Sequence, residues 1–175
     1  MRLFFGFAVP DTLSLELIGV RDRALRQMEA VKPQPVVAGN FHLTLLFIGE
    51  RDEVAAGELA VRADALLADA GEVPLLLTRA HCFPDSRGRV FAAEGPDAGG
   101  LGRLQQRLAR ALGEPLERPL RPHITLARLP RAFVPAPDMP LALPFPASEL
   151  CLYESRQSQW GVRYSVRRRW ILGAG

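Results

Sequence analysis

The chain has 175 residues, of which 48% are hydrophobic and 23% charged, a composition typical of one globular domain and not of a disordered or fibrous chain. The formal net charge of +3 depends almost wholly on arginine, because Lys32 is the one lysine among 22 basic residues. No apolar run reaches the roughly 18–20 residues that cross a bilayer, no signal-peptide pattern is present, and two cysteines are too few for a disulfide framework. We therefore expect a cytoplasmic protein that does not enter a membrane.

The first half of the chain predicts two strands that alternate with two helices. A strand over residues 3–9 is rich in aromatic and branched side chains and is stopped by Pro10. Apolar residues then recur at helical spacing over 12–31. A second strand follows at 41–48, and an alanine- and leucine-rich helix follows at 52–70.

The second half predicts mainly strands. They are a hairpin over 73–83 and 89–94, a strand at 121–127 and a closing hairpin over 150–155 and 161–172. A helix is expected over 98–112, and the proline-rich stretch 130–146 is predicted to be a loop. Because no segment resembles a linker, we expect residues 1–175 to form a single domain.

Two short segments repeat one pattern, a histidine followed two positions later by a threonine. They are Phe41-His42-Leu43-Thr44-Leu45 and Pro122-His123-Ile124-Thr125-Leu126, each inside a predicted strand. The chain holds three histidines and four threonines, so two such coincidences have a probability on the order of a few in a thousand. Because side chains alternate across a strand, each strand would present an imidazole and a hydroxyl on one face.

Such a pair of units suits the opening of a cyclic phosphodiester. Two imidazoles with pKa values near ~6.5 can be one neutral and one protonated, as concerted general base and general acid catalysis requires. The hydroxyls of Thr44 and Thr125 can donate to the non-bridging phosphate oxygens. This chemistry needs no metal and no cofactor, and the residues alone do not say which histidine is protonated at rest.

The two HxT motifs stand in longer segments that resemble a known family. These are RLF at 2–4, FHLTLLFIG at 41–49, RPHITLAR at 121–128, and YES and GVRY at 153–155 and 161–164. They are similar to the bacterial and archaeal RNA 2′,3′-cyclic phosphodiesterases, formerly called 2′-5′ RNA ligases, of the 2H phosphoesterase superfamily. The resemblance covers nearly the whole chain.

The resemblance implies an α+β fold of two lobes with pseudo-twofold symmetry, each an antiparallel sheet with outer helices, around a central groove. It also implies a role in RNA processing: the terminal 2′,3′-cyclic phosphate of RNA is hydrolysed to a 2′-phosphate, and some members slowly join RNA halves through 2′-5′ bonds. By position, His42 resembles the proton donor and His123 the proton acceptor. We expect RNA as the partner, no cofactor, no metal and a monomer.

Phe47 and Arg128 each follow a motif histidine by five positions and match family positions that face the nucleotide. Strict alternation would turn both away from the histidine face, so each strand must bulge or end first, or these are core and surface residues. If they face the groove, Phe47 is a platform for base stacking and Arg128 a contact for phosphate or sugar.

Other polar residues have a simpler interpretation. His81, beside Cys82, is expected to be structural or at the surface. The arginines at 103, 107 and 110, and those at 167–169, predict solvated faces that could also attract an RNA backbone.

Three alternatives stay open. The same chemistry could act on a small cyclic nucleotide, an ADP-ribose cyclic phosphate or a 2′-5′-linked oligonucleotide. A non-catalytic RNA-binding protein could keep the fold, although binding alone does not need two titratable groups. A metal-dependent hydrolase is disfavoured, because the histidines have neither paired spacing nor clustered carboxylates.

Overall fold

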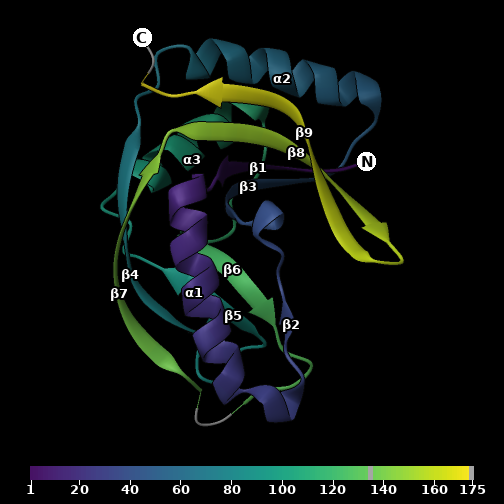
Figure 1. Ribbon diagram of the computed structural model, residues 1–175. Helices are drawn as coiled ribbons and strands as arrows, with labels where there is room; N and C mark the ends of the chain where they lie inside the picture. The colour runs from purple at the N-terminus through teal and green to yellow at the C-terminus, as the bar shows by residue number, and fades with distance from the viewer. Residues whose placement is uncertain (134–135, 174–175) are drawn as a thin grey trace.

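The computed structural model describes residues 1–133 and 136–173, in which helices and strands alternate before the chain ends in strands (Figure 1). The helices are α1 (Asp11–Gln27), α2 (Glu53–Leu67) and α3 (Gly100–Leu112), with two short 3-10 turns at Glu29–Val31 and Ala38–Asn40. The strands are β1 (Arg2–Ala8), β2 (Gln34–Pro35), β3 (His42–Glu50), β4 (Val73–Phe83), β5 (Val90–Glu94), β6 (His123–Arg128), β7 (Asp138–Ala147), β8 (Glu149–Ser158) and β9 (Gly161–Ile171).

The strands form two antiparallel halves that meet at the two motif strands. The order is β7-β4-β5-β6-β3-β1-β8-β9, and the short β2 pairs with β6. The halves are joined through one residue pair between β3 and β6, Leu43 with Ile124. The predicted α+β class with two lobes is confirmed, and the backbone pairing runs continuously from one lobe to the other.

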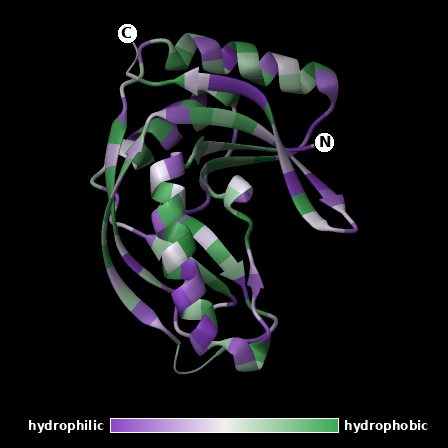
Figure 2. Ribbon diagram, viewed as in Figure 1, coloured by the Kyte–Doolittle hydropathy of each residue, from purple (hydrophilic) through white to green (hydrophobic). Residues whose placement is uncertain are grey.

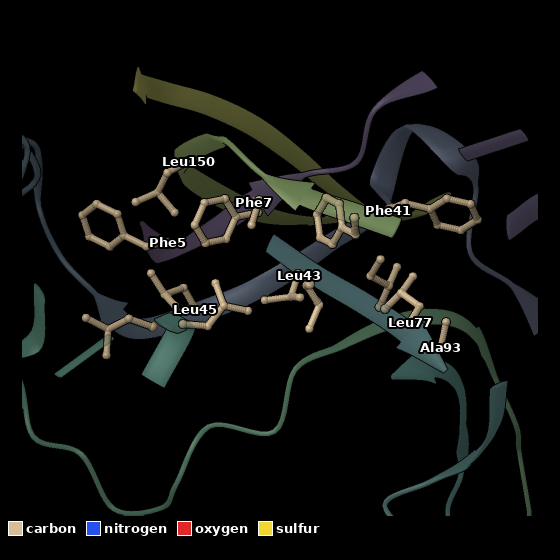
Figure 3. Packing of buried hydrophobic residues seen from close by; sticks show 14 of the residues in the cluster. Phe5, Phe7, Phe41, Leu43, Leu45, Leu77, Ala93 and Leu150 are labelled. Atoms are coloured by element: carbon tan, nitrogen blue, oxygen red, sulfur yellow. The ribbon is translucent and has the colours of Figure 1, made fainter. Parts of the chain in front are cut away.

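One apolar core supports both lobes. Its buried side chains come from all three helices and from the inward face of the strands, among them Phe5, Phe7, Leu43 and Ile124. Figure 3 shows the packing of Phe5, Phe7, Leu43 and Leu150 from neighbouring strands. In Figure 2 the helices carry mixed apolar and polar stripes, whereas β9 is largely hydrophilic. The helices therefore cover the core face of the sheet and leave the opposite face to the motifs.

The prediction of a loop over 130–146 was wrong for most of its length. Residues 138–147 form strand β7, which pairs with β4 at the edge of the sheet, while positions 134–135 lie outside the described residues. Proline removes a backbone donor, which usually argues against a central strand. Here Pro144 and Pro146 lie two residues apart on β7, which ends the strand order, so their missing N–H groups fall together on the open edge.

The first helix is shorter than the spacing predicts. It ends at Gln27, and the chain continues into the 3-10 turn Glu29–Val31, whose buried Val31 had extended the apolar pattern. The predicted hairpin over 73–83 and 89–94 is confirmed as β4 and β5. In the described part of the chain, no helix is both long and apolar enough to cross a membrane.

Candidate active site

The junction of the two lobes brings both HxT motifs together. Leu43 and Ile124, the pair that joins β3 to β6, point into the core and are fully buried. Alternation along each strand therefore turns the neighbours of this pair to the opposite face, where all four motif side chains are half-buried. The structure thus places His42, Thr44, His123 and Thr125 on one surface across two antiparallel strands.

Both imidazoles are held by the same backbone contact. His42 Nδ1 donates to the carbonyl oxygen of Asn40 at 2.8 Å, and His123 Nδ1 donates to the carbonyl oxygen of Arg121 at 2.8 Å. A carbonyl can only accept, so the proton of each neutral ring resides on Nδ1. Nε2 is then the atom that takes up or delivers a proton, and Nε2 of His42 lies 3.1 Å from the hydroxyl oxygen of Thr44.

Matching bulges turn the flanking residues toward the motif face. In β3, Gly6 pairs with Thr44 and Phe5 with Leu46, so Leu45 is the extra residue. In β6, Ala92 pairs with Thr125 and Phe91 with Ala127, so Leu126 is extra. Each bulge reverses the alternation after the threonine, and the exposed side chains of Phe47 and Arg128 return to the side of the histidines. Phe47 and Arg128 could face the groove only if each strand bulged or ended first, and the structure shows a bulge in both strands.

An aromatic wall surrounds His42. The ring of Phe4 lies 4.8 Å from the imidazole and that of Tyr164 lies 4.9 Å away, nearly perpendicular to it. A side chain at Gly6 would be crowded, because a Cβ atom there would lie 3.1 Å from the carbonyl oxygen of Leu43 and 3.3 Å from Cε2 of the Phe4 ring. Neither Phe4 nor Tyr164 was singled out from the sequence as part of the site.

A charged network supports His123. The Glu94 carboxylate accepts hydrogen bonds from Arg121 Nε and Nη2, both at 2.8 Å, and from His81 Nε2 at 2.5 Å. The Phe83 ring stacks on His123 with centroids 4.1 Å apart, and the Arg121 guanidinium lies 4.4 Å from the centroid of Phe83. His81 is buried, as expected for a structural histidine, but its partner Glu94 faces His123 across β5 and β6.

Different charges act on the two histidines. Burial lowers the pKa of His42, the Asn40 carbonyl raises it, and the positive charges of His123 and Arg128 lower it further. Burial also lowers the pKa of His123, whereas the Arg121 carbonyl and the Glu94 carboxylate raise it and the Arg121 guanidinium lowers it. The pKa values of both histidines lie below the ordinary histidine value. Of the charged groups that shift them, a carboxylate, Glu94, acts on His123 alone.

The arginine clusters lie outside this site. Arg167, Arg168 and Arg169 form ion pairs with carboxylates of α2 and β8. The arginines at 103, 107 and 110 are exposed on α3, whose buried side belongs to the core. Among residues 1–133 and 136–173, no three His, Cys, Asp or Glu side chains are grouped so as to hold a metal ion.

Comparison with known proteins identifies the family. The family described as the 2′-5′ RNA ligase superfamily matches residues 14–159. The chain belongs to this superfamily. A Thermus thermophilus RNA 2′,3′-cyclic phosphodiesterase is 31% identical over 98% of this chain and 90% of its own length. The Escherichia coli protein of the same name is 30% identical over 98% of this chain and 96% of its own length.

Solved structures of the superfamily share the fold. A crystal structure of a Thermus thermophilus protein aligns with a TM-score of 0.84 at 27% identity, covering 99% of this chain and 98% of its own. Escherichia coli LigT in its apo form aligns with a TM-score of 0.80 at 30% identity, covering 98% and 96%. The predicted membership of the RNA cyclic phosphodiesterase family is thus confirmed, and the roles of single residues stay predictions.

Proposed function

We propose that this protein hydrolyses the terminal 2′,3′-cyclic phosphate of RNA to a 2′-phosphate, with His42 and His123 as the acid–base pair. The observation that carries the proposal is the pair of half-buried imidazoles on adjacent strands, each with Nδ1 held by a backbone carbonyl. The names of its relatives in Thermus and Escherichia coli support the same activity. We place this activity in the cytoplasm, in a monomer.

The proposed reaction needs one proton taken and one proton given. Nε2 of His123 removes a proton from water, the water oxygen attacks phosphorus, and the bond from phosphorus to the ribose 3′ oxygen breaks. Nε2 of His42 delivers its proton to that oxygen. The electrostatics favour this division, because the Glu94 carboxylate stabilises positive charge as it develops on His123, and Arg128 makes protonated His42 a stronger acid.

Thr44 and Thr125 complete the proposed site. Their hydroxyls lie on the same face as the imidazoles and can donate to the non-bridging phosphate oxygens. Arg128 would add a charged donor to the phosphate or sugar, and Phe47, 71% exposed, offers its ring to the terminal base.

The proposal is tested with an RNA that ends in a 2′,3′-cyclic phosphate, incubated with the protein in the presence of a chelator. We expect one product isomer, the 2′-phosphate, identified by phosphorus NMR. His42→Ala and His123→Ala should each lower turnover by about 10²–10⁴-fold while circular dichroism shows an intact fold. Thr78→Val, at an exposed threonine outside the motifs, is the control for Thr44→Val and Thr125→Val.

Near-normal turnover in either histidine variant would sink the acid–base assignment, and a 3′-phosphate product would reverse the proposed orientation of the ribose. A small cyclic nucleotide is the second candidate substrate. It is favoured by the crystal structures of Escherichia coli LigT with 3′-AMP and with ATP, ligands of mononucleotide size. Comparing kcat/KM for a mononucleotide 2′,3′-cyclic phosphate and for RNA separates the two substrates.

A further inference from the structure

The hairpin of β8 and β9 extends beyond the rest of the sheet. The outermost residue pair between β1 and β8 is Arg2 with Ser155. Residues 156–163, which we call the arm, form strand pairs only with each other. Figure 1 shows the arm projecting past the body of the molecule. At its tip the Ser158 hydroxyl donates to the carbonyl oxygen of Gly161 at 2.8 Å, and the Trp160 side chain is 82% exposed.

The arm is fixed to the surroundings of His42. Asn40 uses its main-chain carbonyl to hold His42 Nδ1 at 2.8 Å, and its side-chain amide donates to the carbonyl oxygen of Val162 in the arm at 3.0 Å. Tyr164, at the base of the arm, packs on Phe4 and meets the His42 ring edge to face. The arm therefore continues the histidine face as a surface of defined position.

The chemistry of this surface suits a nucleic acid strand. No acidic residue occurs between Ser155 and Ile171. The two arginines of the arm, Arg156 and Arg163, pair with each other one position beyond Ser155 and Tyr164, so they lie on the opposite face from Tyr164. The cation on the histidine face is therefore contributed by β1. Arg2 lies on the same side of β1 as Phe4 and forms no ion pair with any described residue. From Tyr164 to Trp160 the arm adds a reach of roughly 13 Å, at about 3.3 Å per strand residue. A base can stack on an exposed indole, and a phosphate can bind a guanidinium.

The geometry of the reaction decides which part of the RNA reaches the arm. In an in-line attack, water enters on one side of phosphorus and the ribose oxygen leaves on the other, so the ribose and the nucleotides before it lie beside the acid. With His42 as the acid, they lie on the lobe that carries the arm. We infer that the arm binds the RNA strand 5′ of the cyclic phosphate, with Trp160 stacking on an upstream base. This inference depends on the proposed function.

The test varies the length of the substrate. We would measure kcat/KM for a mononucleotide 2′,3′-cyclic phosphate and for RNAs of two, four and eight nucleotides with the same end. Trp160→Ala should lower kcat/KM for the octamer by about 5- to 100-fold and leave the mononucleotide within twofold of the unmodified protein. Trp160→Phe should restore much of the octamer rate. Arg2→Gln should lower the slope of log kcat/KM against log salt by about 0.7 for the octamer. Arg107→Gln, at an exposed arginine of α3, is the control.

The outcomes separate the inference from the proposed function. If no cyclic phosphate is hydrolysed, the proposed function fails, and binding of an octamer with a 2′-phosphate end, followed by Trp160 fluorescence, still tests the arm. Equal effects of Trp160→Ala on the mononucleotide and the octamer would overturn the inference. The inference would also be overturned if sedimentation showed a dimer that Trp160→Ala converts to a monomer, because the arm would then be a self-association surface.

Discussion

Replacing Glu94 by glutamine tests how the second lobe holds its histidine. The substitution keeps the shape of the side chain and removes the negative charge that accepts hydrogen bonds from His81 and from two nitrogens of Arg121 at 2.5–2.8 Å. An amide oxygen can keep part of this set, and hydrogen bonds to charged groups contribute about 1.5–3 kcal/mol each. Because the Arg121 side chain is 47% exposed, water screens part of the loss, and we expect the free energy of unfolding to fall by about 1–3 kcal/mol.

The effect on catalysis should exceed the effect on folding. Arg121 provides the carbonyl that orients His123, and its guanidinium covers the far side of Phe83, so a loose Arg121 displaces the imidazole from its working position. Since displacement of about 1 Å costs on the order of 10²-fold, we expect kcat/KM to fall by about 10- to 100-fold.

The pH profile of kcat/KM identifies the role of His123. Loss of the Glu94 charge removes one of the two influences that raise the pKa of His123, so burial and the Arg121 guanidinium lower that pKa further. If His123 is the base, the acid limb of the profile moves to lower pH; if it is the acid, the alkaline limb moves instead. The control is Asp138→Asn, which breaks a similar bidentate pair with Arg79 on the same lobe. Equal rates and unshifted limbs in both variants would refute the positioning of His123 by Glu94.

Further expectations concern pH, packing and the core. The kcat/KM profile of the unmodified protein should be bell-shaped with both limbs below about 6.5, because the pKa values of both histidines are lowered; a flat profile from pH 5 to 9 would contradict this. Below about pH 6.5, the unfolded chain binds more protons at these two histidines than the folded chain does, so stability falls as the pH falls. His42→Gln removes one of these sites and should make the Tm depend less on pH in that range. Gly6→Ala should crowd the Leu43 carbonyl and the Phe4 ring that packs on His42, and lower kcat/KM by about tenfold or more, with a shifted His42 NMR signal; an unmoved signal would count against this packing. Leu108→Ala, on the buried side of α3, should lower the free energy of unfolding in urea by about 2–5 kcal/mol with little change in KM.

Much of the fold could be predicted because apolar alternation and helical spacing are local signals. The motif strands are examples, since His42 and Thr44 alternate with buried leucines as the sequence indicates. Strand β7 escaped prediction because its prolines suit only a strand whose outer side has no neighbour, and sequence alone does not say which strand that is.

The candidate site was predictable in its four motif residues and less so beyond them. The bulges left a signal that could have been used: after strict alternation, two apolar residues follow each other in Leu45-Leu46 and again in Leu126-Ala127. Such a doubled position marks the point where the facing reverses. The contact of Glu94 with Arg121 joins the end of β5 to the segment before β6, and no local pattern indicates it.

The two outer strands also determine how this chain behaves among copies of itself. A sheet that does not close leaves two rows of backbone groups able to pair with another molecule, the contact from which aggregates grow. Along β7, prolines leave the outer row short of donors, and along β9, exposed arginine side chains line the other row. Each strand thus resists addition of a further strand, β7 by lack of donors and β9 by its charged side chains, three of which are held in ion pairs. Replacing the β7 prolines with valine should therefore increase aggregation while leaving the rate of the reaction nearly unchanged.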